Sequence, residues 1–279
     1  IFINKQTSSP GGWHSGAVPV DLSAMPAPLY VQLEWDEYND PGNTVYIDDL
    51  RITSSVRSNP SSNLVLQSGD FSGDGKTDIA VFRPDDGLWA VRGLGRIYYG
   101  QSGDIPAGGD YNGDGITDIA VYRSTNGLWA VKDLTRFYYG SPDDIPVPSD
   151  YNGDTITEAG IYRPGTGLWA IRGWSRFYFG RNEDLPDPGD FGGWGRSQAA
   201  LYRPESGLWA IRELTRIYYG QNGDYPAAGD YDGDGTREAA IYRPLTGLWA
   251  VSFLTRVYFG NNNDIPVPAD YSGNGTDRI

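Results

Sequence analysis

The sequence repeats every 40 residues, and this period constrains the fold more than any other feature. An acidic phrase, Asp-(Phe/Tyr)-x-Gly-Asp-Gly-x-Thr-Asp, begins at Asp70 and again at Asp110. Divergent copies begin at Asp150, Asp190, Asp230 and Asp270. Five full units end at Ala269, and a sixth breaks off at Ile279. A fixed period of between about 20 and 50 residues is typical of a stack or ring of identical supersecondary units.

Each unit predicts three strong β-strands, at about 78–83, 87–93 and 95–100 in the first unit and 40 residues later in each following one. In the 87–93 strand, Trp89 and Val91 alternate with Leu88 and Ala90, so we expect one of its faces to be core. The "DIPVP"-type segment carries prolines and is predicted to be an edge strand or a crossing segment. Three or four antiparallel strands in about 40 residues correspond to one propeller blade. We therefore predict an all-β chain with a β-propeller at 64–279, in which five complete units suggest five blades and the extra half-unit suggests six.

The first 56 residues do not belong to the repeat. Segments 29–35 and 44–52 alternate with period two around a turn-rich loop, which predicts an antiparallel hairpin. This hairpin resembles the closing hairpin of a carbohydrate-binding-module or lectin-like jelly roll. We expect residues 1–56 to be a partial β-sandwich and residues 57–63, which are polar and Ser-rich, to be a linker.

The acidic loops have the spacing of a calcium site. Calcium takes six to eight oxygen ligands, and side chains at loop positions 1, 3, 5 and 9 with the position-7 backbone carbonyl can supply them. Four loops are predicted to bind calcium, and three to four ions in all are expected. The predicted ligands are Asp70, Ser72, Asp74, Lys76 and Asp78; Asp110, Asn112, Asp114, Ile116 and Asp118; Asp150, Asn152, Asp154, Ile156 and Glu158; and Asp230, Asp232, Asp234, Thr236 and Glu238.

The other two loops depart from this pattern. In the fourth, Gly192, Trp194 and Gln198 replace three ligands, so we predict no metal there and expect Trp194 to fill the space. The sixth loop has Arg278 at its ninth position, so we expect at most weak calcium binding there. No loop has the bidentate glutamate of an EF-hand, so a dissociation constant of roughly 10⁻⁴ to 10⁻³ M is expected. The alternative is that these loops are only Asp/Asn/Gly turns.

The repeat resembles the FG-GAP/VCBS family, whose calcium-binding blades also occur in integrin α-subunit propellers. The residues that carry the resemblance are DFSGDGKTDIAVFRP (70–84), DYNGDGITDIAVYR (110–123) and DYDGDGTREAAIYRP (230–244). The resemblance covers residues 64–279 and implies a calcium-binding propeller, usually in secreted or surface proteins. It does not imply one particular activity.

Aromatic and arginine residues also recur once per unit. Blade-to-blade packing is the favoured interpretation of the tryptophans, which lie at positions 89, 129, 169, 209 and 249, and of the Tyr/Phe pairs from 98–99 to 258–259. The alternative is a lectin with five aromatic sugar sites. The arginines at 83, 123, 163, 203 and 243 are expected to pair with the "DIP" aspartates at 104, 144, 184, 224 and 264.

Composition excludes several functional classes. A net charge of −14 argues against a nucleic-acid partner, and no segment is apolar over the roughly 20 residues that span a bilayer. The absence of cysteine excludes disulfides and thiolate catalysis. The single histidine, His14, lies outside the repeats, so a His-dependent triad is not credible and we predict no enzymatic activity.

Together these features predict a secreted or cell-surface, calcium-stabilised propeller with a structural or adhesive role. Expected partners are further copies of the chain, a surface or matrix protein, or a glycan. The incomplete ends suggest a head-to-tail filament built by strand complementation, although truncation of a longer polypeptide is the slightly favoured explanation. The alternatives are a carbohydrate-binding lectin module and a targeting module of a larger secreted enzyme. Asn274 begins a glycosylation sequon within the sixth loop.

Overall fold

The computed structural model describes residues 65–262 and 264–279. These residues lie in the second of two units into which the chain divides, Val56–Ile279. The predicted sandwich fragment at 1–56 and the linker at 57–63 lie outside the described residues. Within the described part every regular element is a β-strand, and none of its segments is a helix long and apolar enough to cross a membrane.

Twenty strands form five separate four-stranded antiparallel sheets, one per 40-residue unit. The first sheet contains β1 (Val65–Gly69), β2 (Asp78–Arg83), β3 (Leu88–Val91) and β4 (Gly95–Tyr98). The second contains β5 (Ile105–Pro106), β6 (Ala120–Arg123), β7 (Leu128–Val131) and β8 (Thr135–Tyr138). The third contains β9 (Ile145–Pro146), β10 (Gly160–Arg163), β11 (Leu168–Ile171) and β12 (Ser175–Tyr178). The fourth contains β13 (Leu185–Pro186), β14 (Ala200–Arg203), β15 (Leu208–Ile211) and β16 (Thr215–Tyr218), and the fifth β17 (Tyr225–Pro226), β18 (Ala240–Arg243), β19 (Leu248–Val251) and β20 (Thr255–Tyr258).

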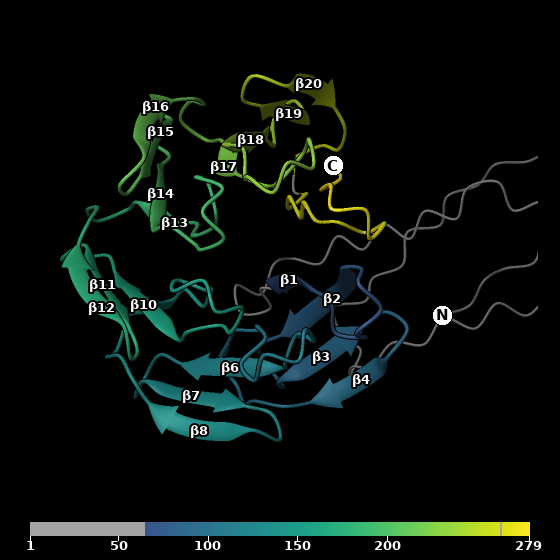
Figure 1. Cartoon of the computed structure of the whole chain (residues 1–279), viewed down its shortest axis with the longest axis vertical. Helices are drawn as coiled ribbons and strands as arrows, with labels where there is room; N and C mark the ends of the chain where they lie inside the picture. The colour runs from purple at the N-terminus through teal and green to yellow at the C-terminus, as the bar shows by residue number, and fades with distance from the viewer. Residues whose placement is uncertain (1–64, 263) are drawn as a thin grey trace, which may run out of the picture. The chain divides into compact units, whose positions relative to one another are not determined.

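Strands follow one another outward in chain order within each sheet, and the sheets follow one another around a ring as propeller blades (Figure 1). The "DIP" segments form the innermost strands of sheets two to five and pair on one side only, as their prolines require. The prediction of edge strands there is confirmed. So is the propeller architecture, with five four-stranded blades.

The acidic loops, which we number one to six from Asp70 to Asp270, close the ring. In each case the backbone N–H of a loop's eighth residue donates to the carbonyl of the preceding loop's first residue. Thr117 donates to Asp70 at 2.7 Å, and Thr77 completes the cycle by donating to Asp270 at 2.9 Å. The six loops therefore form one closed hydrogen-bonded cycle, although the described residues form five sheets. The sixth unit adds one isolated bridge, Ala269 to Arg278, and no sheet of its own within the described residues.

The middle strands are buried on both faces, whereas the sequence predicted one core face. In β15 all four residues, Leu208 to Ile211, are buried, because the fourth sheet is packed between the third and the fifth. The recurring tryptophans are the largest core residues: four have no exposed surface and Trp249 has little. Each packs against the aromatic residue beside it on the previous strand, as Trp129 does against Tyr122 at 5.2 Å between ring centroids. The packing interpretation is confirmed for the tryptophans.

The first aromatic of each Tyr/Phe pair does not pack between blades, which corrects the sequence-based expectation. Tyr98, Tyr138, Tyr178, Tyr218 and Tyr258 are 70–76% exposed. They lie on the outermost strand of each sheet, where no further strand covers them. The second aromatic of each pair is half-buried, except Phe259, which is exposed.

Four recurring arginines form two-pronged ion pairs with buried "DIP" aspartates. Arg203 Nε and Nη2 donate to the two carboxylate oxygens of Asp184 at 2.7 and 2.9 Å, and the other three pairs repeat this geometry. The hydrogen bond to the carboxylate raises the pKa of Arg203. The pairing is thus confirmed for four of the five arginines. Arg83 instead contacts Asp86 on the exposed surface at 3.4 Å.

Candidate metal centre

The acidic loops are folded by their own first aspartate. Asp110 Oδ1 accepts the backbone N–H groups of Gly113 at 2.7 Å and Asp114 at 3.2 Å, and its Oδ2 accepts that of Gly115 at 2.8 Å. The ninth residue, Asp118, accepts the N–H of Tyr111 at 2.9 Å. Gly113 and Gly115 have φ values of +78° and +83°, which only glycine adopts without strain. Thr155 takes the place of the second glycine in loop three and still adopts a φ of +72°.

Two loops bring three or more carboxylates together. In loop five, Asp230, Asp232, Asp234 and Glu238 each place an oxygen within 4.8 Å of the others. In loop three, Asp150, Asp154 and Glu158 do the same. Across residues 65–262 and 264–279 these are the two clusters with that spacing, so the acidic residues of loops one and two do not reach it.

Electrostatics at these clusters favour a cation. Burial raises the pKa of Glu238 to about 7, and repulsion from Asp232, Asp230 and Asp234 adds to the rise although a hydrogen bond from the Tyr231 backbone opposes it. The pKa values of Glu158 and Asp118 are raised for the same kinds of reason. A divalent cation would relieve this repulsion, and hard carboxylate, amide and carbonyl oxygens are the donors that calcium prefers. The residues present therefore fit calcium.

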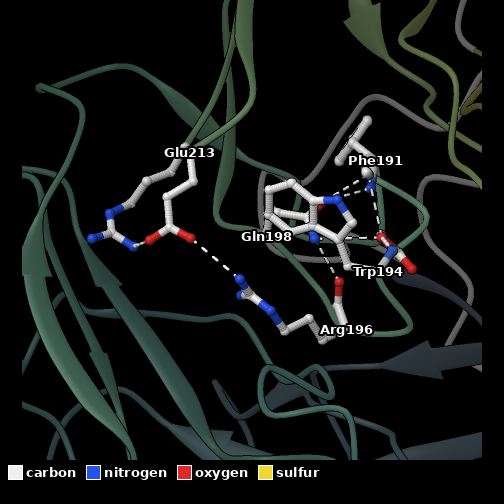
Figure 2. Close-up of polar contacts among 8 residues, drawn as sticks. Phe191, Trp194, Arg196, Gln198 and Glu213 are labelled. Carbon is white, nitrogen blue, oxygen red and sulfur yellow. Dashed lines mark hydrogen bonds and ion pairs between the residues drawn. The ribbon is translucent and has the colours of Figure 1, made fainter.

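Loop four is held differently, by the side chain of Gln198. The carboxamide oxygen accepts the N–H groups of Phe191 at 2.7 Å and Gly192 at 2.9 Å, as the carboxylates of the other loops accept theirs. The carboxamide nitrogen donates to the carbonyl of Arg196 at 2.6 Å and to Asp190 Oδ1 at 3.4 Å (Figure 2). Those acceptors are positions seven and one, two of the oxygens predicted to ligate calcium elsewhere. The amide N–H₂ thus contacts two of the oxygens a cation would bind.

Trp194 fills only part of this space: its indole lies over Gly192, where an added Cβ would meet it at 2.7 Å. Trp194 is 45% exposed, whereas Gln198 is 3% exposed. The sequence signal that could have identified Gln198 is its chemistry, because glutamine keeps the acceptor of glutamate and adds a donor.

We expect the Gln198→Leu change to destabilise the protein by about 2–4 kcal/mol equally with and without calcium. The substitution leaves the Phe191 and Gly192 N–H groups and the Arg196 carbonyl without their partner, and unsatisfied buried groups cost about 1–3 kcal/mol each. Urea unfolding in calcium and in EGTA measures the effect. The matched variant Glu238→Gln should instead weaken one calcium site about tenfold or more and change the free energy of unfolding mainly when calcium is present. A calcium-dependent effect of Gln198→Leu would contradict the assignment.

Comparison with known families adds to this geometry. Residues 63–99, which contain loop one and the first sheet, match the model of the FG-GAP repeat. The later units repeat the antiparallel strand order and the loop hydrogen bonds of this first unit. No curated protein sequence matches the chain.

Three solved structures that are similar to this chain have low sequence identity to it. BBS1N in complex with ARL6DN, from the mercury-soaked crystal, has a TM-score of 0.43 and 9% identity, over 71% of this chain and 69% of that one. The lead-soaked crystal of the same complex has a TM-score of 0.46 and 11% identity, over 71% of this chain and 68% of that one. A lectin of Agrocybe aegerita, solved to explain recognition of non-reducing terminal N-acetylglucosamine, has a TM-score of 0.40 and 13% identity, over 76% of this chain and 81% of that one.

Proposed function

We propose that this chain is a secreted or cell-surface propeller, stabilised by calcium in loops one, two, three and five, with a structural or adhesive role. The observation that carries the proposal is the loop-five cluster, where four carboxylates crowd together and the pKa of Glu238 rises. Each loop is hydrogen-bonded to its neighbours in the ring. An ion bound in a loop would therefore stabilise the junction between units as well as the loop itself.

The expected affinity supports an extracellular location. Sites without a bidentate position-twelve glutamate bind in the range of roughly 10⁻⁴ to 10⁻³ M, and such sites fill where calcium is millimolar. Calcium titration calorimetry tests this: three to four sites in that range are expected. A titration without heat, in protein first stripped by EGTA, would contradict the proposal.

We propose no catalytic role. The recurring acids are engaged in loop turns or in ion pairs with arginine, so none of those groups is free to act as an isolated acid or base. Carboxylate pairs alone do not make a glycosidase, and the propeller fold by itself does not decide function. The reading as a targeting module of a larger secreted enzyme remains compatible with this view.

Self-association is a second proposal, favoured by the face of β20. Val257 in β20 and Phe259 directly after it are exposed, whereas Ile97, Phe137 and Phe177, which correspond to Val257, are half-buried against the next sheet. Exposed apolar strands of this kind pair with other chains unless they are covered. Two copies could associate there and form the filament by strand complementation.

We expect sedimentation velocity to show concentration-dependent association between about 1 and 100 µM, and the Phe259→Glu change to abolish it. Buried charge opposes association because an unpaired carboxylate must lose its water. The control is Tyr218→Glu, at a comparably exposed position on β16. A monomer at every concentration would remove the assembly proposal and leave the calcium proposal intact.

A further inference from the structure

One pocket between two blades collects residues at which the repeat departs from its own pattern. It lies between the third and fourth sheets, has a volume of about 490 Å³, and is lined in part by Trp174, Arg196 and Glu213. The other four units have leucine at the position of Trp174, and none has arginine at that of Arg196 or glutamate at that of Glu213. Packing between blades is the same task at every interface, so packing does not explain these three residues.

The neighbouring interface, between the second and third sheets, is an internal reference. There Arg172 lies over the ring of Phe137 at 4.2 Å, as Arg212 lies over Phe177 at 4.0 Å in the pocket. The arginine-on-phenylalanine contact is therefore shared by these two interfaces and does not distinguish the pocket. The reference interface has Leu134, Ile156 and Gly173 in place of the three distinctive residues.

The charged wall of the pocket consists of planar groups joined by ion pairs. Glu213 accepts Nη2 of Arg196 at 3.3 Å and Nη1 of Arg212 (Figure 2). Arg196 is held from its other side by the indole of Trp194, 5.0 Å from the ring centroid. Each guanidinium has five N–H donors, so both keep donors for a ligand while Glu213 keeps acceptor capacity.

The aromatic part of the pocket lining is Trp174. Its side chain is 43% exposed although it lines the pocket, and it lies in the tight turn between β11 and β12. Asn152, Ser175 and Ser197 add short polar side chains to the lining. The pocket therefore combines a partly exposed indole with several hydrogen-bond donors and acceptors.

We propose that this pocket binds one neutral pyranose ring of a glycan. The C–H face of a pyranose carries partial positive charge and suits the negative face of an indole. Planar guanidinium and carboxylate groups suit its neighbouring hydroxyls, which offer donors and acceptors side by side. A volume of about 490 Å³ lies within the usual range for small-molecule sites. The strongly acidic chain, at −14, disfavours a polyanionic ligand.

This single site differs from a lectin built on the recurring tryptophans. Those indoles are buried in the blade cores and cannot present a face to a sugar. None of its three distinctive residues is a predicted calcium ligand, although the lining residue Asn152 is one in loop three.

Saturation-transfer NMR on the full chain tests the site. The probes are methyl glycosides of glucose, galactose, mannose, N-acetylglucosamine and N-acetylgalactosamine, each at about 10 mM so that millimolar sites are populated. At least one glycoside should receive saturation from the protein. Trp174→Leu and Glu213→Gly should each weaken its binding about tenfold or more in a titration. Both variants restore residues that other units carry, so they should melt within a few degrees of the parent.

The matched control is Leu134→Trp, which adds an indole at the reference interface without the charged wall. It should leave the number of binding sites at one. Absence of transfer to every glycoside would overturn the proposal. So would binding that persists unchanged in both Trp174→Leu and Glu213→Gly.

Discussion

Chelating calcium with excess EGTA is expected to lower the melting temperature by about 10–20 °C. A ligand that binds only the folded state stabilises it by RT ln(1 + [L]/Kd). With 2 mM calcium and a Kd of about 10⁻⁴ M, each site contributes about 2 kcal/mol, so three sites contribute roughly 5 kcal/mol. For a domain of this size, 1 kcal/mol shifts the melting temperature by about 2–4 °C. Differential scanning calorimetry in calcium and in EGTA measures the difference.

Magnesium serves as the control for that experiment. It is smaller, prefers octahedral geometry and gives up water reluctantly, so magnesium added to the EGTA-treated protein should restore little of the lost stability. An Asp230→Ala variant should lose about one site's share of the calcium effect. A melting temperature that is the same in calcium and in EGTA would show that the acidic loops act only as turns.

Removing the arginine of one buried ion pair is expected to cost about 3–5 kcal/mol. In Arg203→Ala, the carboxylate of Asp184 stays buried and loses its two-pronged partner, which is the costly way to break such a pair. Asp184 keeps the backbone N–H of Arg181 at 3.0 Å, which does not neutralise its charge. Urea unfolding at constant calcium measures the loss.

Arg83→Ala is the matched control, since Arg83 occupies the same repeat position and pairs only with exposed Asp86. Exposed pairs contribute about 0–1 kcal/mol, so this change should be nearly silent. Replacing both partners, as in Asp184→Leu with Arg203→Met, should cost clearly less than Arg203→Ala alone. Equal losses in Arg203→Ala and Arg83→Ala would contradict the role assigned to burial.

Local features were the ones that could be predicted from the repeat. The strands, the edge position of the proline segments and the pairing of recurring arginines with "DIP" aspartates follow from side-chain alternation, missing N–H groups and opposite charges. The spacing did not say which aspartate each arginine meets, such as Asp184 for Arg203. The candidate calcium ligands also came from spacing alone, because a nine-residue loop folds on itself. Where a residue's environment is set within its own unit, sequence spacing carries the information.

Contacts between units could not be predicted in this way. The burial of both faces of β15, the exposure of Tyr218 and the closure of six loops around five sheets depend on what packs beside each blade. The role of Gln198 was also not predicted. From the sequence it only replaces a calcium ligand, whereas in the structure its amide nitrogen donates to oxygens of Asp190 and Arg196.

The sequence by itself determined the 40-residue unit, its strands and the acidic loops, because these rest on side chains a few positions apart in the chain. Only the tertiary structure decided which of those residues meet. Trp174 and Glu213 are 39 positions apart, in equivalent turns of successive units, and line one pocket because their blades are adjacent in the ring. A periodic sequence specifies each unit, whereas the packing of one unit against the next decides where its exceptions come together.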